Sequence, residues 1–223
     1  MQATELNTVL AAVGAMVLTV MSSAQAQDAQ RLDGLDAAAV VEQLRHVPSS
    51  MPASVPSSGI ERPAELLRRQ IYDRLLVLSP ASIHALARGL QDPDVEFRRN
   101  AALALGVLSG HWWSFGGETH SVDLSVVLPE LLSALTDPDS TVRAWVAQDI
   151  GNIGASAVSA VPQLIALLEN GDEAARNSSC IALRRIGPPA VAALPALQRA
   201  LSDPSADVRK FAALAIESIE GQR

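Results

Sequence analysis

The 223 residues suffice for one compact domain or one short repeat array, and an apolar content of 48% supports a buried core. Because only 3% of the residues are aromatic, alanine, leucine, valine and isoleucine must build that core, which favours closely packed helices over strands. The formal net charge of −7 argues against nucleic-acid binding, and the single cysteine, Cys180, excludes an intramolecular disulfide and a cysteine-based metal cluster.

Residues 1–26 have the pattern of a secretory signal peptide. An apolar stretch of 14 residues runs from Thr8 to Met21, and Ala24-Gln25-Ala26 then matches a small-x-small cleavage site. The stretch is short for a bilayer span, which needs about 20 residues. The residues before it include Glu5 and no lysine or arginine, which departs from the usual pattern. We expect cleavage near Ala26 and a periplasmic or secreted bacterial protein without a membrane span; retention of residues 8–21 as an anchor is the alternative.

Residues 27–62 are expected to hold one helix and a linker. Residues 35–47 have a helical pattern, whereas residues 48–63 contain four prolines and five serines and suit a flexible or extended linker. A second helix is expected at residues 64–78, as an N-terminal cap on the array that follows. The first helix is expected to dock on that array or on a partner.

Four blocks of similar sequence follow, and their aligned leucines are Leu90, Leu135, Leu168 and Leu201. The last three leucines are 33 residues apart, while the first interval is 45 residues and contains an insertion at 111–121. This periodicity predicts repeats at about 80–110, 122–154, 155–187 and 188–221, within a domain spanning 63–223.

Each block reads as two antiparallel helices joined by a tight turn. The turns carry Asp-Pro or Asn-Gly, which favour chain reversal. The residues that follow the turn at one aligned position are good N-caps for the second helix: Asp94, Asp139, Asp172 and Ser205. The second helix is expected to bury one stripe, such as Val142, Val146, Ile150 and Ile153. Gly154 and Gly187 are expected to end their helices.

The pattern D-P-x-x-x-V-R, followed by an alanine-rich helix, resembles the short HEAT-like repeat, which also occurs in phycobilin lyases. The resemblance covers residues 80–223, although the third block has Asn170-Gly171 and Ala175 in place of Asp-Pro and valine. It implies an all-α fold: an α-α superhelix of about four helix pairs with an N-terminal helical cap. In such families the repeated aspartates and arginines form a structural ladder, which here comprises Asp92, Asp137, Asp203, Arg98, Arg143, Arg176 and Arg209.

The insertion is rich in aromatic residues, which are enriched at binding hot spots. Trp112, Trp113 and Phe115 are therefore candidates for partner binding, and the alternative is that they cover the gap between helix pairs. The same region offers His111, Glu118, His120 and Asp123 as possible metal ligands, but their spacing matches no zinc motif with a known mechanism.

The second helices are also expected to offer a binding face on the inner side of the superhelix. Asn100, Trp145, Ser178 and Phe211 are aligned equivalents and would form one row. Several residues of the second helices lie outside the buried stripe, and we expect them to contact a partner. They are Arg99, Asn100, Trp145, Gln148, Asn177, Arg185, Lys210 and Phe211. Aromatic and basic residues together suit a peptide or an acidic protein surface. Alternatively, Trp145 caps the core and Phe211 shields the last repeat.

We therefore predict an exported, non-enzymatic scaffold or adaptor that binds a protein or peptide, with no cofactor and no metal. The sequence contains no nucleophile elbow, phosphate loop or His-Glu-x-x-His helix. The resemblance to phycobilin lyases implies a chromophore lyase or maturation factor as the alternative. A metal-dependent sensor or hydrolase centred on His111 and His120 is the second alternative.

Overall fold

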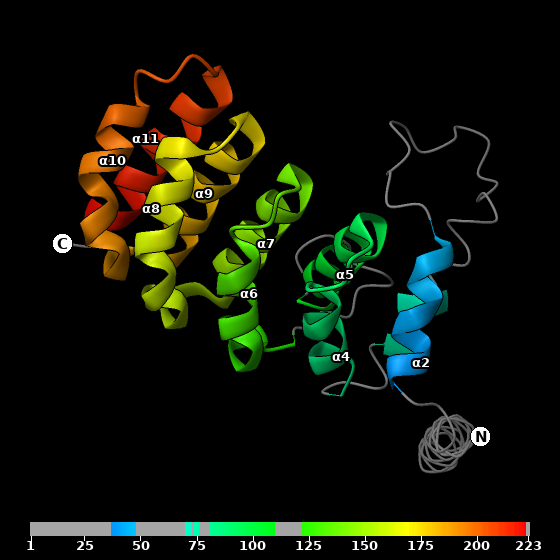
Figure 1. Cartoon of the computed structure of the whole chain (residues 1–223). Coiled ribbons are helices and arrows are strands. Elements are labelled where there is room, and N and C mark those ends of the chain that lie inside the picture. The colour runs from blue at the N-terminus through cyan, green and yellow to red at the C-terminus, as the bar shows by residue number, and fades with distance from the viewer. Residues whose placement is uncertain (1–36, 48–69, 73, 76–80, 110–121, 222–223) are drawn as a thin grey trace, which may run out of the picture. The chain divides into compact units, whose positions relative to one another are not determined.

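The computed structural model describes residues 37–47, 70–72, 74–75, 81–109 and 122–221 (Figure 1). The predicted signal peptide, the linker and the insertion lie outside these residues. The chain divides into two compact units, Met1–Asp36 and Ala37–Arg223, and every described residue belongs to the second.

The described part of the second unit is helical and has no strand, as an all-α fold requires. It begins with α2 (Ala37–Glu42) and the 3₁₀ helix η1 (Gln43–His46). The four helix pairs that follow are α4 (Ala81–Gly89) with α5 (Val95–Leu108), α6 (Leu128–Ala134) with α7 (Ser140–Ile153), α8 (Val161–Asn170) with α9 (Glu173–Ile186), and α10 (Leu194–Ala200) with α11 (Ala206–Glu220). Short 3₁₀ helices precede the last three pairs: η2 (Leu124–Val127), η3 (Gly154–Ala160) and η4 (Pro188–Ala193).

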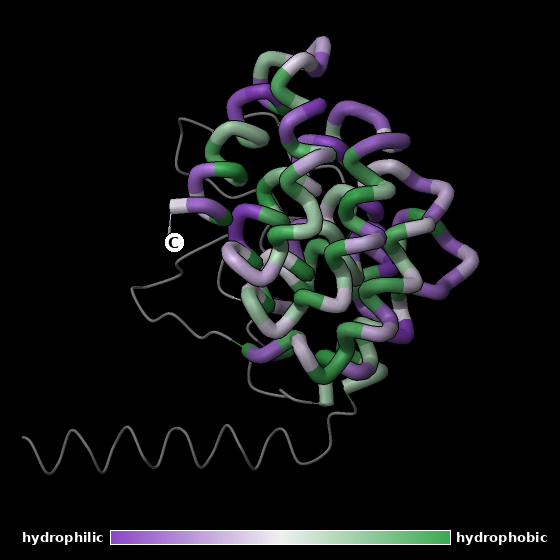
Figure 2. The backbone as a smooth tube through the Cα atoms, turned by 90° about the vertical axis from the view of Figure 1, so that its left-hand side faces the viewer, coloured by the Kyte–Doolittle hydropathy of each residue, from purple (hydrophilic) through white to green (hydrophobic). Residues whose placement is uncertain are grey.

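The helix pairs stack so that like helices are neighbours. The second helices α5, α7, α9 and α11 contact one another in chain order (Figure 1). Among the first helices, α4 contacts α6 and α8 contacts α10. Along each helix, hydrophobic residues alternate with hydrophilic ones (Figure 2). This pattern is that of amphipathic helices, each of which buries one face against its neighbours.

A side chain caps the start of each second helix at the position that the sequence predicts. Asp94 accepts a hydrogen bond from the Glu96 amide, and Asp139, Asp172 and Ser205 accept from the amide three residues further on. These caps satisfy backbone amides that have no partner within the helix, so the capped turn fixes where each second helix begins.

Glycine ends α7 and α9, also as predicted. Gly154 and Gly187 adopt φ angles of 70° and 72°, which other residues rarely adopt. The apolar run Ser140–Asn170 is long enough to cross a membrane by length and composition. Gly154 divides this run into α7 and α8, which belong to successive helix pairs.

The stacked second helices approach one another closely because small residues line their contacts. A Cβ atom on Gly151 of α7 would lie 2.8 Å from the Cα atom of Ala182 of α9, which is closer than real contacts allow. Of the expected buried stripe on α7, Val142, Val146 and Ile150 are fully buried. Ile153 is only half-buried, because it lies at the end of the helix beside a small cleft.

Candidate partner-binding surface and the ladder beneath it

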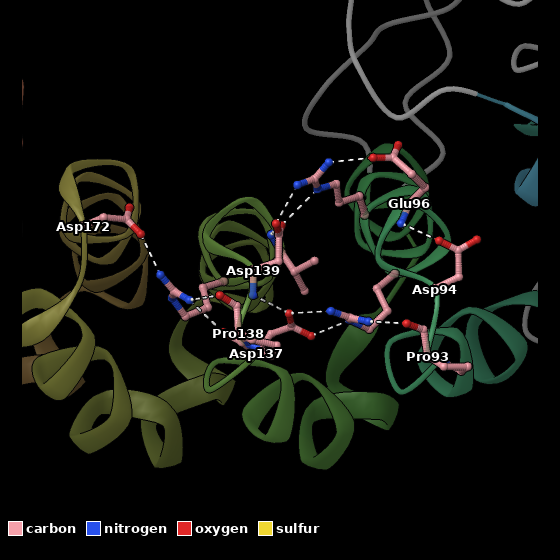
Figure 3. A network of polar contacts seen from close by, with 11 residues as sticks. Pro93, Asp94, Glu96, Asp137, Pro138, Asp139 and Asp172 are labelled. Atoms are coloured by element: carbon pink, nitrogen blue, oxygen red, sulfur yellow. Dashed lines mark hydrogen bonds and ion pairs between the residues drawn. The ribbon is translucent and has the colours of Figure 1, made fainter.

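A ladder of arginine–aspartate bonds joins the turns of neighbouring helix pairs (Figure 3). Arg98 of α5 donates to both carboxylate oxygens of Asp137 in the next turn, at 2.7 and 3.2 Å, and to the carbonyls of Asp92 and Pro93 in its own turn. Each rung therefore holds its own turn and the next turn together.

The rung repeats along the array with one variation. Arg176 binds Asp203 at 2.7 and 2.9 Å in the same two-pronged way. In the third block Asn170 replaces the turn aspartate, and Arg143 instead binds the helix cap Asp172 at 2.6 Å. Arg143 keeps its bonds to the carbonyls of its own turn, at Asp137 and Pro138.

Two carboxylates of the ladder, Asp92 and Asp203, are held in their charged form. The pKa of Asp203 lies below its ordinary value because Arg176 donates to it, and the pKa of Asp92 is lowered in the same way by Arg45. Arg98, Arg143 and Arg176 and their aspartate partners neutralise one another within the array. They are therefore occupied by structural bonds in this part of the chain.

The N-terminal segment α2–η1 supplies a rung that the sequence analysis missed. Arg45 donates to both oxygens of Asp92, at 3.0 and 2.5 Å, and its guanidinium lies 4.0 Å from the centre of the Phe97 ring. Segment α2–η1 contacts α4 and α5, so it docks on the array and extends the ladder by one unit. The signal was a lone arginine near the end of a helix, without the Asp-Pro turn that marks the other rungs.

Asn100 is not part of a partner-binding surface, which corrects the sequence prediction. It is 0% exposed, and its amide nitrogen donates to the carbonyls of Leu44 and Val47 at 3.0 and 2.6 Å. Segment α2–η1 therefore covers the position that was expected to begin the row. Sequence periodicity placed Asn100 on the right face of α5 but could not show that another segment lies against it.

The rest of the row is discontinuous. Trp145 of α7 and Phe211 of α11 are partly exposed, whereas the aligned Ser178 of α9 is buried. Gln148 is half-buried and donates to the Ser178 hydroxyl at 3.1 Å. Asn177 is also half-buried, and its carbonyl oxygen has no hydrogen-bond partner. Two aromatic side chains thus flank small polar residues on the helix between them.

The expected basic residues divide into one that is paired and two that are exposed. Arg99 binds Asp139 at 3.0 and 2.6 Å and Glu96 at 2.6 Å, so its charge is used within the array. Arg185 is exposed and bonds to the Asn152 side chain, and its pKa is lowered by desolvation and by Arg184 beside it. Lys210 is exposed and lies 5.7 Å from the centre of the Phe211 ring.

The aromatic insertion residues Trp112, Trp113 and Phe115 lie outside the described residues, as do His111, Glu118 and His120. Asp123 of the proposed metal set is described, and it caps η2 by accepting from the Ser125 amide at 2.8 Å. Among the residues that the structure describes, no group of three or more histidines, cysteines or carboxylates is placed to hold a metal. A cleft of about 250 Å³ lies where the insertion joins the array, lined by Ser109, Val122, Asp123, Leu124, Asn152 and Ile153.

Cys180 lies in α9 and is fully buried. Burial raises the pKa of its thiol to about 12, so the thiolate needed for nucleophilic chemistry is scarce at neutral pH. The cysteine serves as a small hydrophobic residue of the core.

Residues 128–217 match the family described as HEAT repeats. The helix pairs of the described array have the HEAT-like repeat fold. This match covers α6 to α11 and agrees with the paired helices, the capped turns and the ladder. No curated protein matches the sequence.

Solved structures with the same fold include designed and natural repeat proteins. An engineered protein superposes with a TM-score of 0.58 at 20% identity, covering 83% of this chain and 79% of the other. A computationally designed armadillo repeat protein for modular peptide recognition gives 0.55 at 20% identity, with 82% and 81% covered. The CpcE–CpcF complex of phycocyanin lyase from Nostoc sp. PCC7120 gives 0.51 at 24% identity, with 77% and 70% covered. At these identities the likeness concerns the fold alone.

Proposed function

We propose that this HEAT-like repeat protein is a non-enzymatic scaffold or adaptor that binds a protein or peptide through its second helices. The observation that carries the proposal is the partial exposure of Trp145 and Phe211 on two helices of the same layer. Large aromatic side chains that stay partly exposed are typical anchors of protein–protein interfaces.

The layer around these two residues suits an extended ligand. Between them, α9 carries the half-buried Asn177, and Gln148 of α7 donates to the Ser178 hydroxyl. Amide side chains of this kind can hydrogen-bond to a peptide backbone. In repeat arrays the regular spacing of such side chains matches the extended surface that a peptide offers. A designed armadillo protein of the same fold was made for modular peptide recognition, which supports this use of the layer.

Charge favours an acidic partner. Arg185 and Lys210 are exposed on the second helices, and the structure records no ion pair for either of them. The ladder arginines, in contrast, are taken up by aspartates or turn carbonyls. A partner with carboxylates beside an apolar segment would pair with these two cations and also contact the partly exposed aromatic side chains.

We further propose that the protein acts outside the cytoplasm after removal of residues 1–26. The support is the apolar stretch before Ala24-Gln25-Ala26 in the sequence. Intact mass measurement of the protein purified from its host tests this. A mature chain that begins at Gln27 supports export, and a chain that retains residues 8–21 contradicts cleavage.

Affinity capture from the host tests the binding surface. The mature chain serves as bait beside a Trp145→Ala/Phe211→Ala variant and a matched control, Val158→Ala/Val191→Ala. The control removes two apolar side chains that are 47% and 44% exposed and lie on the 3₁₀ helices η3 and η4. Far-UV circular dichroism verifies that all three baits have the same helix content.

A protein that the mature chain and the control recover, but the Trp145→Ala/Phe211→Ala bait does not, supports the proposal. Equal recovery by all three baits contradicts the assigned surface. If the bait instead carries a bound pigment and recovers no partner, a chromophore lyase or maturation role replaces the adaptor role. Bound zinc or copper would favour a metal-dependent function at the insertion.

A further inference from the structure

The last helix pair of the described array presents a repeat interface that no described residue covers. Leu201 is 44% exposed, whereas the aligned Leu90, Leu135 and Leu168 are 1%, 3% and 4% exposed. Each of the three buried leucines belongs to a helix pair that another pair follows. Leu201 has the same place in the last described pair.

Two positions on α11 show the same difference. Its Ala213 aligns with Ala102, Ala147 and Cys180, which are all fully buried, yet Ala213 is partly exposed. Its Ile216 aligns with residues that are fully buried in the three other second helices, and it too is partly exposed. Apolar side chains therefore line the face of α11 that in other repeats receives a neighbour. Solenoids ordinarily end in a polar face, so such a face is expected to be covered.

Arg209 occupies the ladder position on α11 and lacks a carboxylate. It donates to the carbonyls of Asp203 and Pro204 in its own turn, as the other rungs do. Arg98, Arg143 and Arg176 each bind an aspartate of the next pair in addition. In the described structure Arg209 therefore binds its own turn but no aspartate of another helix pair.

A head-to-tail arrangement of two copies does not complete it. The acceptor at the other end of the array is Asp92, and Arg45 of segment α2–η1 already binds both of its oxygens. The turn that could receive Arg209 from another copy is closed. A second copy must therefore supply a different carboxylate.

The outer face of α11 carries such a carboxylate, that of Glu217, on the opposite side of Ala213 from Arg209. Arg209 and Glu217 lie four residues before and after Ala213, and both are exposed. Four residues span about 6 Å of helix. Two α11 helices that pack antiparallel and cross at Ala213 would thus place each Arg209 beside the Glu217 of the other copy. The small side chain of Ala213 permits a close crossing.

We propose that two copies of this chain form a two-fold symmetric dimer through the outer face of α11. The contact buries Leu201, Ala213 and Ile216, and two Arg209–Glu217 pairs fix its antiparallel register. Such an isologous interface closes on itself, so it yields dimers and not filaments. Of the proposed adaptor surface, Trp145 lies on α7, whereas Phe211 and Lys210 lie on α11 at positions other than the contact residues Ala213 and Ile216.

The test is the mass of the purified protein in solution, by light scattering coupled to size-exclusion chromatography at about 100 µM chain, a concentration that populates micromolar complexes. The unmodified chain is expected at twice its monomer mass. Arg209→Glu and Glu217→Arg are each expected to elute as monomers, because each places two like charges together at both pairs. Arg88→Glu is the control, since it makes the same charge change at an exposed site on α4.

Exchanging the two charges between chains tests the Arg209–Glu217 pairing most directly. An equimolar mixture of the Arg209→Glu and Glu217→Arg chains is expected to form a heterodimer, because each chain then offers the charge that the other lacks. The double variant Arg209→Glu/Glu217→Arg is expected to return to the homodimer. If Arg209→Glu disturbs its own turn and lowers the helix content, Ala213→Arg replaces it, because that variant places two cations at the crossing.

A monomeric unmodified chain at this concentration would overturn the proposal. So would a dimer that persists in all single variants, or monomeric variants that fail to combine when mixed. None of these results bears on the adaptor surface, because that surface is tested by variants at Trp145 and Phe211. The two proposals therefore fail independently.

Discussion

Asp137 binds two neighbouring helix pairs with one carboxylate. It accepts from Arg98 of the preceding pair and from the Asp139 amide within its own turn. Its side chain is 6% exposed and that of Arg98 is 12% exposed, so solvent screens this pair far less than a surface ion pair.

Asp137→Ala is expected to lower the free energy of unfolding by about 3 kcal/mol, because it leaves the Arg98 charge and a turn amide without their acceptor. Urea denaturation followed by circular dichroism measures this. The control is Glu169→Ala, which removes an exposed pair with Arg199 and is expected to change stability by at most about 1 kcal/mol. Equal losses in the two variants would contradict the structural role of the ladder.

Asp149 of α7 is a buried carboxyl group of the opposite kind. It is 1% exposed, and neither of its oxygens has a hydrogen-bond partner. Desolvation raises its pKa well above the ordinary value, against the opposing influence of Arg185. The aligned residues of the other three second helices are Ala104, Ala182 and Ala215, all buried. The described structure gives this carboxylate no hydrogen bond, and the charge of Arg185 offsets the cost of burying it only in part.

Asp149→Ala is therefore expected to stabilise the protein at neutral pH by about 1 kcal/mol or more. Because the pKa is higher in the folded state, the folded protein binds the proton more tightly than the unfolded chain does. The unmodified protein accordingly loses stability as the pH rises from the ordinary carboxyl range through the raised pKa. The advantage of Asp149→Ala should be large at pH 8 and shrink toward about pH 4. Denaturant titrations at several pH values measure it, and a destabilised variant at every pH would refute the argument.

At the scale of elements, side-chain hydrogen bonds join segment α2–η1 to the first described helix pair. Asn100 binds the carbonyls of Leu44 and Val47 at the end of η1, and Arg45 binds Asp92. The last carbonyls of a helix have no hydrogen-bond donor within that helix. The Asn100 amide of the array donates to two such carbonyls at the end of η1.

Asn100→Ala is expected to loosen this segment and leave the array intact. Amide hydrogen exchange at residues 37–47 should accelerate by about 10-fold or more, because two buried carbonyl bonds are lost. Exchange in α8 to α11 should stay unchanged. Uniform acceleration along the whole chain would mean that the segment is part of one cooperative core and not a separable cap.

How far the sequence predicted these elements depends on whether a signal is local. The caps at Asp94 and Ser205 and the glycine at Gly154 depend on residues within one turn, and the structure confirms them. The burial of Asn100 depends on a segment more than 50 residues away in the chain, and periodicity carries no such information. For the same reason the exposure of Leu201 could not be predicted, since its aligned leucines have identical local sequence roles and differ only in what lies against them.

At the scale of the whole molecule, the charged residues that bond to one another within the array lie in a different place from the exposed cations. The ladder uses its arginines and aspartates at the turns. The second helices keep Arg185 and Lys210 exposed, and they also carry the partly exposed Trp145 and Phe211. The turns therefore carry stability, and the second-helix layer carries the features that a partner would recognise.

The most direct test of that assignment is site-specific photocrosslinking in the host. A photoreactive amino acid is placed at Gln148 of α7, on the second-helix layer, or at Gln163 of α8, an exposed residue on the first-helix layer. The account predicts a crosslinked partner from position 148 that is absent or much weaker from position 163. Crosslinking from position 163 alone, or with equal yield from both positions, would contradict the claim that the second helices form the binding surface.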